Sequence, residues 1–153
     1  MPAVSRDDLA IRPATRGEVG DVLALYQQAG LDRETLPLDQ AQALFDRIQG
    51  YPDYDLMVAC TPEGGIVGSY LLLIMDKLGH LGAPAAVIDD VAVAPDRQGQ
   101  GIGTAMMHDA MARARTRGCY KLMLSSNLAR ERAHRFYEKL GFTQHGVSFE
   151  VGL

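Results

Sequence analysis

The residues best suited to chemistry begin with three glycines that alternate with other residues, Gly99, Gly101 and Gly103. They follow an apolar run and open a stretch with helical periodicity. Glycine lets the backbone approach a ligand closely because it has no Cβ. The N–H groups of a helix's first turn lack partners within the helix and carry partial positive charge. This arrangement predicts a site for phosphate or pyrophosphate, and an ordinary glycine turn before a helix is the alternative.

Two common phosphate-binding motifs do not fit this segment. A P-loop requires a lysine directly after its last glycine, and no lysine follows any of the three glycines here. A dinucleotide fingerprint requires the spacing Gly-x-Gly-x-x-Gly and an acidic residue at the end of the next strand. Here the spacing is Gly-x-Gly-x-Gly, and the next predicted strand runs into Ser125, Ser126 and Asn127. A phosphate-bearing ligand of another class is therefore expected.

Asp89 and Asp90 interrupt the apolar run that precedes the glycines. A carboxylate in a central strand is costly unless it is paired or faces a water-filled cleft. Strand alternation sends two neighbours to opposite faces, so only one would enter a given cleft unless a local bulge changes the pattern. One of the two is a candidate for binding a cationic amine or for removing its proton. Pairing with a nearby arginine or capping a turn is the alternative.

Tyr137 is the third candidate, because a phenol can protonate a departing thiolate. Its alternative role is aromatic packing beside Phe136. The cysteines, Cys60 and Cys119, are expected to be reduced thiols, and a single catalytic cysteine is the less favoured interpretation. No CxxC, HExxH or HxH pattern occurs, so no metal is expected.

The elements that must position these residues follow a single α/β pattern. Alternating or apolar runs predict strands at Asp8–Arg12, Asp55–Thr61, Ile66–Met75, Ala85–Ala94 and Tyr120–Leu124, and one or two closing strands within Phe142–Val151. Helical spacing and end signals predict helices at Thr15–Gly30, Leu38–Ile48, Gly101–Arg117 and Arg130–Leu140. Thr15 and Glu18 have the spacing of a capping box.

Length and composition agree with one soluble domain spanning residues 1–153. Apolar residues make up 47% and charged residues 22% of the chain. The longest uncharged apolar stretch has 12 residues, whereas a helix that spans a bilayer needs about 20. We therefore expect a cytoplasmic protein with no membrane partner.

The net charge of −4 is unevenly distributed, with −8 in residues 1–94 and +4 in residues 95–153. Either two ligands of opposite sign or ordinary surface variation accounts for this difference. No basic face is dense enough to neutralise many phosphates, so no nucleic-acid partner is expected.

Two segments together resemble one family. The pattern Gln98-x-x-Gly101-x-Gly103, after Val91-Ala92-Val93-Ala94-Pro95, resembles the acyl-CoA signature of the GNAT N-acetyltransferase superfamily. The segment Ala133–Phe142, which reads AHRFYEKLGF, is similar to the family's C-terminal motif. The resemblance covers about residues 54–151, which would form the acyl-CoA-binding core.

The resemblance implies a single-domain α/β fold of the GNAT type. Its central sheet would be mixed and mostly antiparallel, with about six to seven strands flanked by about four helices. Acetyl-CoA would be the co-substrate, and no metal would take part. Backbone groups of Val91 and Val93 would bind the pantetheine arm. Backbone amides of the next segment would hold the pyrophosphate, and they belong to Gln98, Gly99, Gln100, Gly101, Ile102, Gly103 and Thr104.

The resemblance also assigns roles near the thioester. Asn127 and Arg130 would flank the pantetheine end, and Tyr137 would lie beside the sulfur. Many members carry an asparagine seven residues before this tyrosine. Here that position is Arg130, and Asn127 lies ten residues before Tyr137. Which of the two takes the usual asparagine role stays open.

The predicted function is transfer of an acetyl group from acetyl-CoA to a primary amine of a small molecule, by direct attack. Gly118–Leu122 and Ile88–Val91 resemble glucosamine-6-phosphate acetyltransferases, and Leu124–Asn127 with Ala133–Tyr137 resembles aminoalkylphosphonate acetyltransferases. Both branches take amines that carry an anionic group, whereas the acidic first half favours a more cationic amine. The alternatives are a protein N-terminal or lysine acetyltransferase, a non-catalytic acyl-CoA sensor, and a nucleotide-binding module. A homodimer is a further expectation.

Overall fold

The computed structural model describes residues 5–153. The chain packs into two compact units, one ending at Met123 and one of residues 124–153, and each is described by itself. The strands of the described residues are β1 (Ala10–Pro13), β2 (Tyr54–Cys60), β3 (Ile66–Met75), β4 (Ala85–Val93) and β5 (Lys121–Met123). The α-helices are α1 (Val19–Gln28), α2 (Leu38–Gln49), α3 (Ile102–Thr116) and α4 (Glu131–Lys139). Short 3-10 helices are η1 (Arg6–Asp8), η2 (Arg16–Glu18), η3 (His80–Gly82) and η4 (Pro95–Arg97).

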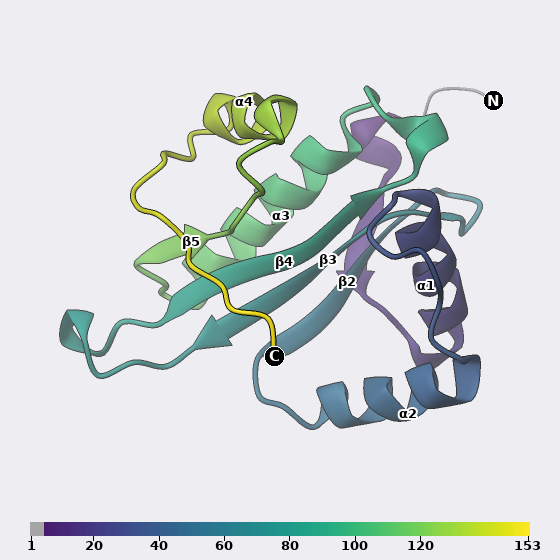
Figure 1. The fold of residues 1–153 in the computed structure, drawn as a ribbon, viewed down its shortest axis with the longest axis horizontal. Helices are drawn as coiled ribbons and strands as arrows, with labels where there is room; N and C mark the ends of the chain where they lie inside the picture. Colours follow the sequence, from purple (N-terminus) through teal and green to yellow (C-terminus); the bar gives the residue numbers. More distant parts are fainter. Residues whose placement is uncertain (1–4) are drawn as a thin grey trace. The chain divides into compact units, whose positions relative to one another are not determined.

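The strands form one sheet in sequence order, β1-β2-β3-β4-β5 (Figure 1). Neighbouring strands are antiparallel from β1 to β4, and β5 is parallel to β4. A parallel neighbour needs a crossover connection, which α3 supplies. The predicted α/β fold with a mixed, mostly antiparallel sheet and four α-helices is therefore confirmed.

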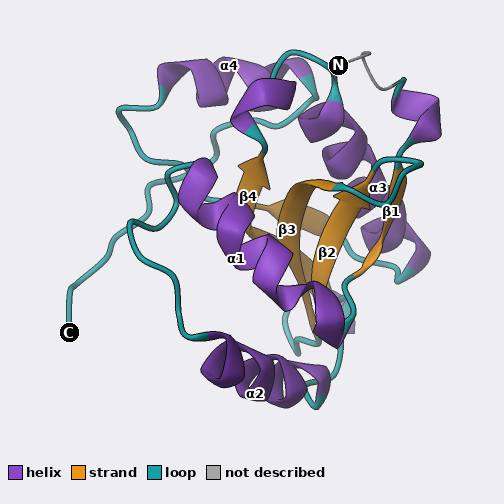
Figure 2. Cartoon of the chain, turned by 90° about the vertical axis from the view of Figure 1, so that its right-hand side faces the viewer, coloured by secondary structure: helices purple, strands orange, loops and turns teal. Residues whose placement is uncertain are grey.

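Side chains of β3 alternate between two covered faces of the sheet. Tyr70 and Leu72 lie on the side of α3, and we call this side the α3 face. Leu71 packs against a cluster contributed by α1, α2 and β2. We call that side the α1–α2 face. Figure 2 shows α1 and α2 on the near side of the sheet. Cover on both faces explains why β3 and β4 read as nearly continuous apolar runs.

Packing on the α3 face is tight. Met106, Met107 and Ala110 of α3 are completely buried. A Cβ on Gly68 would come within 2.9 Å of the Met106 sulfur. The glycine therefore lets α3 approach β3 closely.

One polar network crosses the α3 face. The Tyr70 hydroxyl donates to Oδ2 of Asp109 at 2.6 Å, and Nε of Arg113 donates to the same oxygen at 2.7 Å. Arg113 Nη2 also donates to the carbonyl of Ile11 at 3.3 Å. Burial, followed by the Asp109 hydrogen bond and charge, raises the pKa of Tyr70 above its ordinary value. The phenol thus stays a donor, and the network ties α3 to β3 and β1.

The predicted capping interaction forms where β1 leads into η2. Oε1 of Glu18 accepts from the Thr15 N–H at 2.9 Å and from Nη1 of Arg12 at 2.7 Å. The Arg12 hydrogen bond is the main reason why the pKa of Glu18 falls from 4.5 to about 2. The turn Arg16–Glu18 is a 3-10 helix, and α1 begins after it.

Three features of the predicted sheet are wrong. The described residues contain five strands, not six to seven. The predicted closing strands within Phe142–Val151 do not form, since no ladder in residues 5–153 pairs this segment with another strand, although Val147, Phe149 and Val151 alternate. Residues Arg6–Asp8 form η1, so the first strand begins at Ala10 instead of Asp8. No helix within the described part of the chain is long and apolar enough to cross a membrane.

Candidate active site

The glycine loop, residues 98–101, joins η4 to α3. Gly99 has φ 80° and Gly101 has φ 81°, and this left-handed region favours glycine. A Cβ on Gly101 would also collide with the guanidinium of Arg6. The backbone angle therefore favours glycine at position 101, and any larger residue would also displace the Arg6 guanidinium.

The first turn of α3 offers free backbone donors. Gly101 is the N-cap and has no side chain to accept from them. The Ala105 N–H makes the first helical bond, donating to the Gly101 carbonyl at 3.0 Å. The N–H groups of Ile102, Gly103 and Thr104 thus have no partner within the helix. Together with the Arg6 guanidinium beside Gly101, they give this end of α3 a positive character that suits an anion.

The side chains in this segment differ in exposure. Gln98 and Gly99 are exposed, whereas Ile102 is buried in the core. The amide oxygen of Gln100 is buried and accepts no hydrogen bond within the described residues. An acceptor in that position suits a hydroxyl or amino group of a ligand more than a phosphate oxygen.

β4 has an open edge over its second half. β5 pairs with β4 only from Ala85 to Val87. The Ala94 N–H donates to the Val67 carbonyl at 2.9 Å, on the β3 side. By alternation, the N–H and C=O groups of Val93 and Val91 point to the opposite edge. These backbone groups are available to an extended ligand that binds as an additional strand would.

A bulge separates the two halves of β4. Ser69 pairs with Ala92 and Leu71 pairs with Asp89, so Asp90 and Val91 together lie opposite Tyr70 alone. Asp90 has φ 48°, a left-handed conformation that aspartate and asparagine tolerate better than most side chains. Its N–H donates to Oδ1 of Asp89 at 2.9 Å. The two aspartates of the sequence prediction are therefore joined by a hydrogen bond at a strained turn.

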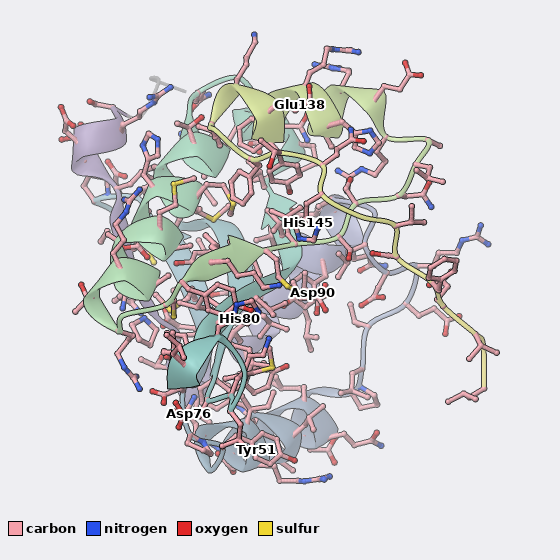
Figure 3. All side chains as sticks on the ribbon, turned by 90° about the vertical axis from the view of Figure 1, so that its left-hand side faces the viewer. Tyr51, Asp76, His80, Asp90, Glu138 and His145 are labelled. Carbon is pink, nitrogen blue, oxygen red and sulfur yellow. The ribbon has the colours of Figure 1, made fainter. Side chains whose placement is uncertain are left out.

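The bulge places both carboxylates near the α1–α2 face. Asp89 is exposed, and Asp90, which Figure 3 labels, is half-buried. Burial is the main cause that raises the pKa of Asp90, and the charges of Asp89 and Asp32 add to it. The Asp90 charge in turn contributes to the raised pKa values of Tyr26 and Tyr54, after burial. Simple alternation, which separates neighbours, does not hold here.

A pocket of about 280 Å³ opens on the α1–α2 face next to this turn. Its wall combines aliphatic and aromatic side chains with a single carboxylate, and the lining residues are Tyr51, Tyr54, Leu71, Leu73, Val87 and Asp89. The register explains the grouping, since Tyr54 pairs with Leu73, which pairs with Val87.

Three predicted site residues belong to the second compact unit, residues 124–153. Tyr137 lies on α4 and packs edge-on against Phe136 and Phe142, with ring centroids 5.1 and 5.7 Å away. Burial raises the pKa of Tyr137, and the Arg130 charge opposes that rise. The phenol is therefore protonated at neutral pH and is able to donate.

Asn127 shapes the turn before α4. Its Oδ1 accepts from the Ala129 N–H at 2.9 Å, and its carbonyl lies 2.8 Å from Nε2 of His134. Arg130, at the helix N-cap, donates its N–H to the Asn127 carbonyl at 3.0 Å. The side-chain oxygen of Asn127 is thus already engaged, whereas the Arg130 side chain is exposed.

The cysteines are not activated nucleophiles. Cys60 is buried, and both Cys60 and Cys119 are free thiols. Burial is the main cause that raises the pKa of each. Within residues 5–153, no three His, Cys, Asp or Glu side chains come together as a metal site would require.

Sequence reasoning missed Arg6 and most of the pocket wall. Nothing in the order of residues links Arg6 to a glycine 95 positions later. Tyr51 and Tyr54 precede the predicted strand Asp55–Thr61, whereas β2 begins at Tyr54, and its register with β3 and β4 brings Tyr54 to the same row as Val87.

The chain is similar to known acetyltransferases. The profile described as Acetyltransferase (GNAT) family matches residues 22–142. A glucosamine 6-phosphate N-acetyltransferase of Trypanosoma brucei brucei is 43% identical over 92 residues, which is 60% of each chain. An aminoalkylphosphonate N-acetyltransferase of Salmonella typhimurium is 33% identical over 91 residues, covering 60% of this chain and 58% of that one. The chain therefore spans about 60% of the length of these curated relatives.

Among solved structures, a Trypanosoma brucei acetyltransferase is 32% identical, with a TM-score of 0.83. The match covers 95% of this chain and 100% of the other chain. At this coverage the match extends into the first fifty residues, before the segment 54–151 that carries the motifs.

Proposed function

The chain belongs to the GNAT acetyltransferase family, and from that premise we propose that it transfers the acetyl group of acetyl-CoA to a primary amine of a small molecule by direct attack. One observation carries the proposal. The open edge of β4 leads straight from the Asp89–Asp90 bulge into the glycine loop and the free donors of α3. A long ligand with phosphates at one end and a reactive group at the other matches that order of features.

The donor would lie along the open edge. Backbone groups of Val91 and Val93 would hydrogen-bond its pantetheine arm. The backbone amides of residues 98–104, with the cation of Arg6 near Gly101, would hold its pyrophosphate. In the second unit, Asn127 and Arg130 would flank the pantetheine end.

When bound, acetyl-CoA supplies an acetyl group on a thioester whose thiolate can leave. Asp90 would accept a proton from the ammonium group of the acceptor, so that the neutral amine can attack the acetyl carbon. A raised pKa brings a carboxylate closer to the range in which it works as a base. Asp89, which lines the pocket, would hold the ammonium group.

Two further roles, stabilising the negative charge on the carbonyl oxygen and protonating the departing sulfur, need N–H or O–H groups. A backbone N–H in the Val91 region would stabilise negative charge that develops on the carbonyl oxygen. Tyr137 would give its proton to the departing sulfur, and its raised pKa keeps that proton available. The C–N bond would form as the amine attacks, and the C–S bond would break as the thiolate leaves. The new amide nitrogen would release its extra proton to water, and Asp90 would release the proton that it took from the ammonium group. The Tyr137 phenolate would regain a proton from water, which returns both side chains to their starting states.

Acetyl-CoA-dependent thiol release with a panel of amines tests the function. The panel contains amino sugars, polyamines, aminophosphonates, arylalkylamines, amino acids and short peptides. Turnover with a small amine is expected, and turnover with peptides alone would favour a protein acetyltransferase instead. Tight acetyl-CoA binding by calorimetry without turnover would favour a non-catalytic sensor. Stabilisation by ATP or NAD but not by acetyl-CoA would favour a nucleotide-binding module.

Tyr137→Phe isolates the acid role. Phenylalanine keeps the packing with Phe136 and Phe142 and removes the proton. We expect kcat to fall about 100-fold, with unchanged affinity for acetyl-CoA. Tyr120→Phe, an exposed tyrosine in the other unit, is the matched control. Equal kcat for Tyr137→Phe and the unchanged protein across pH would leave Tyr137 a packing residue.

A homodimer is also proposed. Val147, Phe149, Val151 and Leu153 are exposed apolar residues that alternate along the segment after α4. A second copy would bury them. Sedimentation equilibrium of the protein and of Phe149→Ser compares the two association states.

A further inference from the structure

Resting on the proposed function, we propose that the acceptor is a primary ammonium ion carried by an apolar or aromatic body without phosphate, bound in the pocket of Tyr51, Tyr54 and Asp89. Its nitrogen would lie at Asp89, and its body would lie against the tyrosine rings and the aliphatic wall. This class of acceptor is narrower than the small amines that the proposed reaction allows.

The wall of the pocket favours an apolar body. Leu71, Leu73 and Val87 come from paired positions on β3 and β4 and present hydrocarbon to the cavity. The rings of Tyr51 and Tyr54 lie 6.1 Å apart at 42°, beside that surface. A cavity of about 280 Å³ is just below the usual range for small-molecule sites, roughly 300–1,000 Å³, which suits a small acceptor.

The charges around the pocket favour a cation and oppose a phosphate. Asp89 is the one charged residue of the wall within the described part of the chain, and neither lysine nor arginine lines it there. Asp90 follows it in the chain, and Asp32 is close enough to act on Asp90. An anionic group here would meet carboxylates and find no cation on the described wall to pair with. An ammonium ion gains both the Asp89 carboxylate and the faces of two tyrosine rings.

The position of Asp89 connects this pocket to the reacting atoms. Asp89 accepts the Asp90 N–H, so its carboxylate is fixed at the bulge. The open edge of β4, where the thioester would lie, begins at the same turn. An amine held by Asp89 would therefore lie next to Asp90, the proposed base, and next to the thioester of acetyl-CoA.

This acceptor differs from those in the names of the two curated relatives, which are a phosphorylated amino sugar and aminoalkylphosphonates. A phosphate or phosphonate group would need a cation that the described pocket wall does not contain. The pocket thus supports a different acceptor class for this chain.

Matched pairs of amines test the inference. Glucosamine is compared with glucosamine 6-phosphate, and tyramine with tyramine O-phosphate, by thiol release with acetyl-CoA. We expect kcat/KM to be at least about tenfold higher for the phosphate-free member of each pair, and highest for tyramine. Preference for the phosphorylated members would overturn the inference and leave the proposed acetyl transfer standing.

Binding of the same amines is measured separately by calorimetry, in the presence of desulfo-CoA. If no amine is acetylated, the proposed function fails, and the inference still requires that tyramine bind more tightly than its phosphate. Equal or weaker binding of tyramine overturns it. The two failures are therefore distinguishable.

One exposed position changes the charge of the wall without disturbing the core. Tyr51 is 52% exposed, and Tyr51→Lys places a cation in the pocket. We expect it to raise KM for tyramine several-fold and to reduce the preference against tyramine O-phosphate. Tyr120→Lys is the matched control, because Tyr120 is 36% exposed and lies outside the pocket. The same change in preference for both variants would contradict the inference.

Discussion

Each face of the sheet brings a tyrosine near a carboxylate, and the two faces differ in whether a cation pairs with that carboxylate. On the α3 face, the Tyr70 hydroxyl donates to Asp109, which also binds Arg113, so the charges are paired. On the α1–α2 face, Tyr54 lies near Asp89 and Asp90, which have no cation among the described pocket-lining residues. A paired carboxylate contributes to the fold, whereas an unpaired one beside a cavity is available to a ligand.

Asp90→Asn tests the unpaired side and is expected to have the largest effect. Asparagine tolerates the left-handed conformation and keeps the size of the side chain. It cannot accept the proton, so kcat/KM is expected to fall about 100-fold or more. Burial and the charges of Asp89 and Asp32 make the ionised Asp90 costly to fold. The free energy of unfolding at neutral pH should therefore stay equal or rise, as urea denaturation would measure.

Asp109→Ala tests the paired side. It leaves the Tyr70 hydroxyl and the Arg113 guanidinium without their shared acceptor. Because Asp109 and Arg113 are only partly buried, the free energy of unfolding should fall by about 2 kcal/mol. The kcat/KM of the folded enzyme should remain within about twofold, since the lost hydrogen bonds hold α3 to the sheet and involve no residue of the pocket wall. A loss of activity in fully folded protein would break the contrast between the faces.

Asp89→Asn tests which role belongs to Asp89 and which to Asp90, the two carboxylates of the α1–α2 face. The Asp89 charge raises the pKa of Asp90, so its removal lowers that pKa. Asp90 must be ionised to act as a base, and kcat/KM therefore falls as pH drops below its pKa. The acidic limb of the pH profile should move to lower pH in Asp89→Asn, and KM for the amine should rise. If Asp89→Asn abolishes kcat and Asp90→Asn does not, the two roles are reversed.

Glu18→Gln gives the smallest expected effect and lies outside the pocket and the α3 network. Pairing with Arg12 lowers the pKa of Glu18 from 4.5 to about 2. A lowered pKa adds stability that is complete above the unfolded value and lost as pH falls through the folded value. The variant should lose about 1 kcal/mol at neutral pH, and the difference should vanish between pH 4.5 and about 2. Urea midpoints across that range measure it.

The sequence was sufficient wherever local chemistry decides the structure. The predicted strand Ile66–Met75 is matched by β3, because both faces of that strand are covered and its run is apolar throughout. The predicted helix after the glycine pattern is matched by α3, which begins at Ile102. Thr15 and Glu18 form their predicted interaction, since both partners lie within one turn.

The sequence was insufficient where distant segments meet. One or two closing strands are predicted within Phe142–Val151, but a strand needs a partner ladder, and no pattern within the segment reveals whether one is present. The bulge at Asp90 depends on the register between β3 and β4, which two separate runs do not specify. For the same reason the pocket wall, which joins Tyr51 to Val87, is visible only in the fold.

The left-handed turn at Asp90 has a consequence for how such a protein can change over generations. Few side chains are accepted at φ 48°, and aspartate, asparagine and glycine are the ones that fit most easily. A single base change converts an aspartate codon into an asparagine codon. One mutation can therefore remove the proposed base while the fold, the glycine loop and the open edge of β4 survive. A gene copy altered in this way would encode a protein that still recognises the donor but no longer consumes it, which makes the step from enzyme to ligand sensor unusually short.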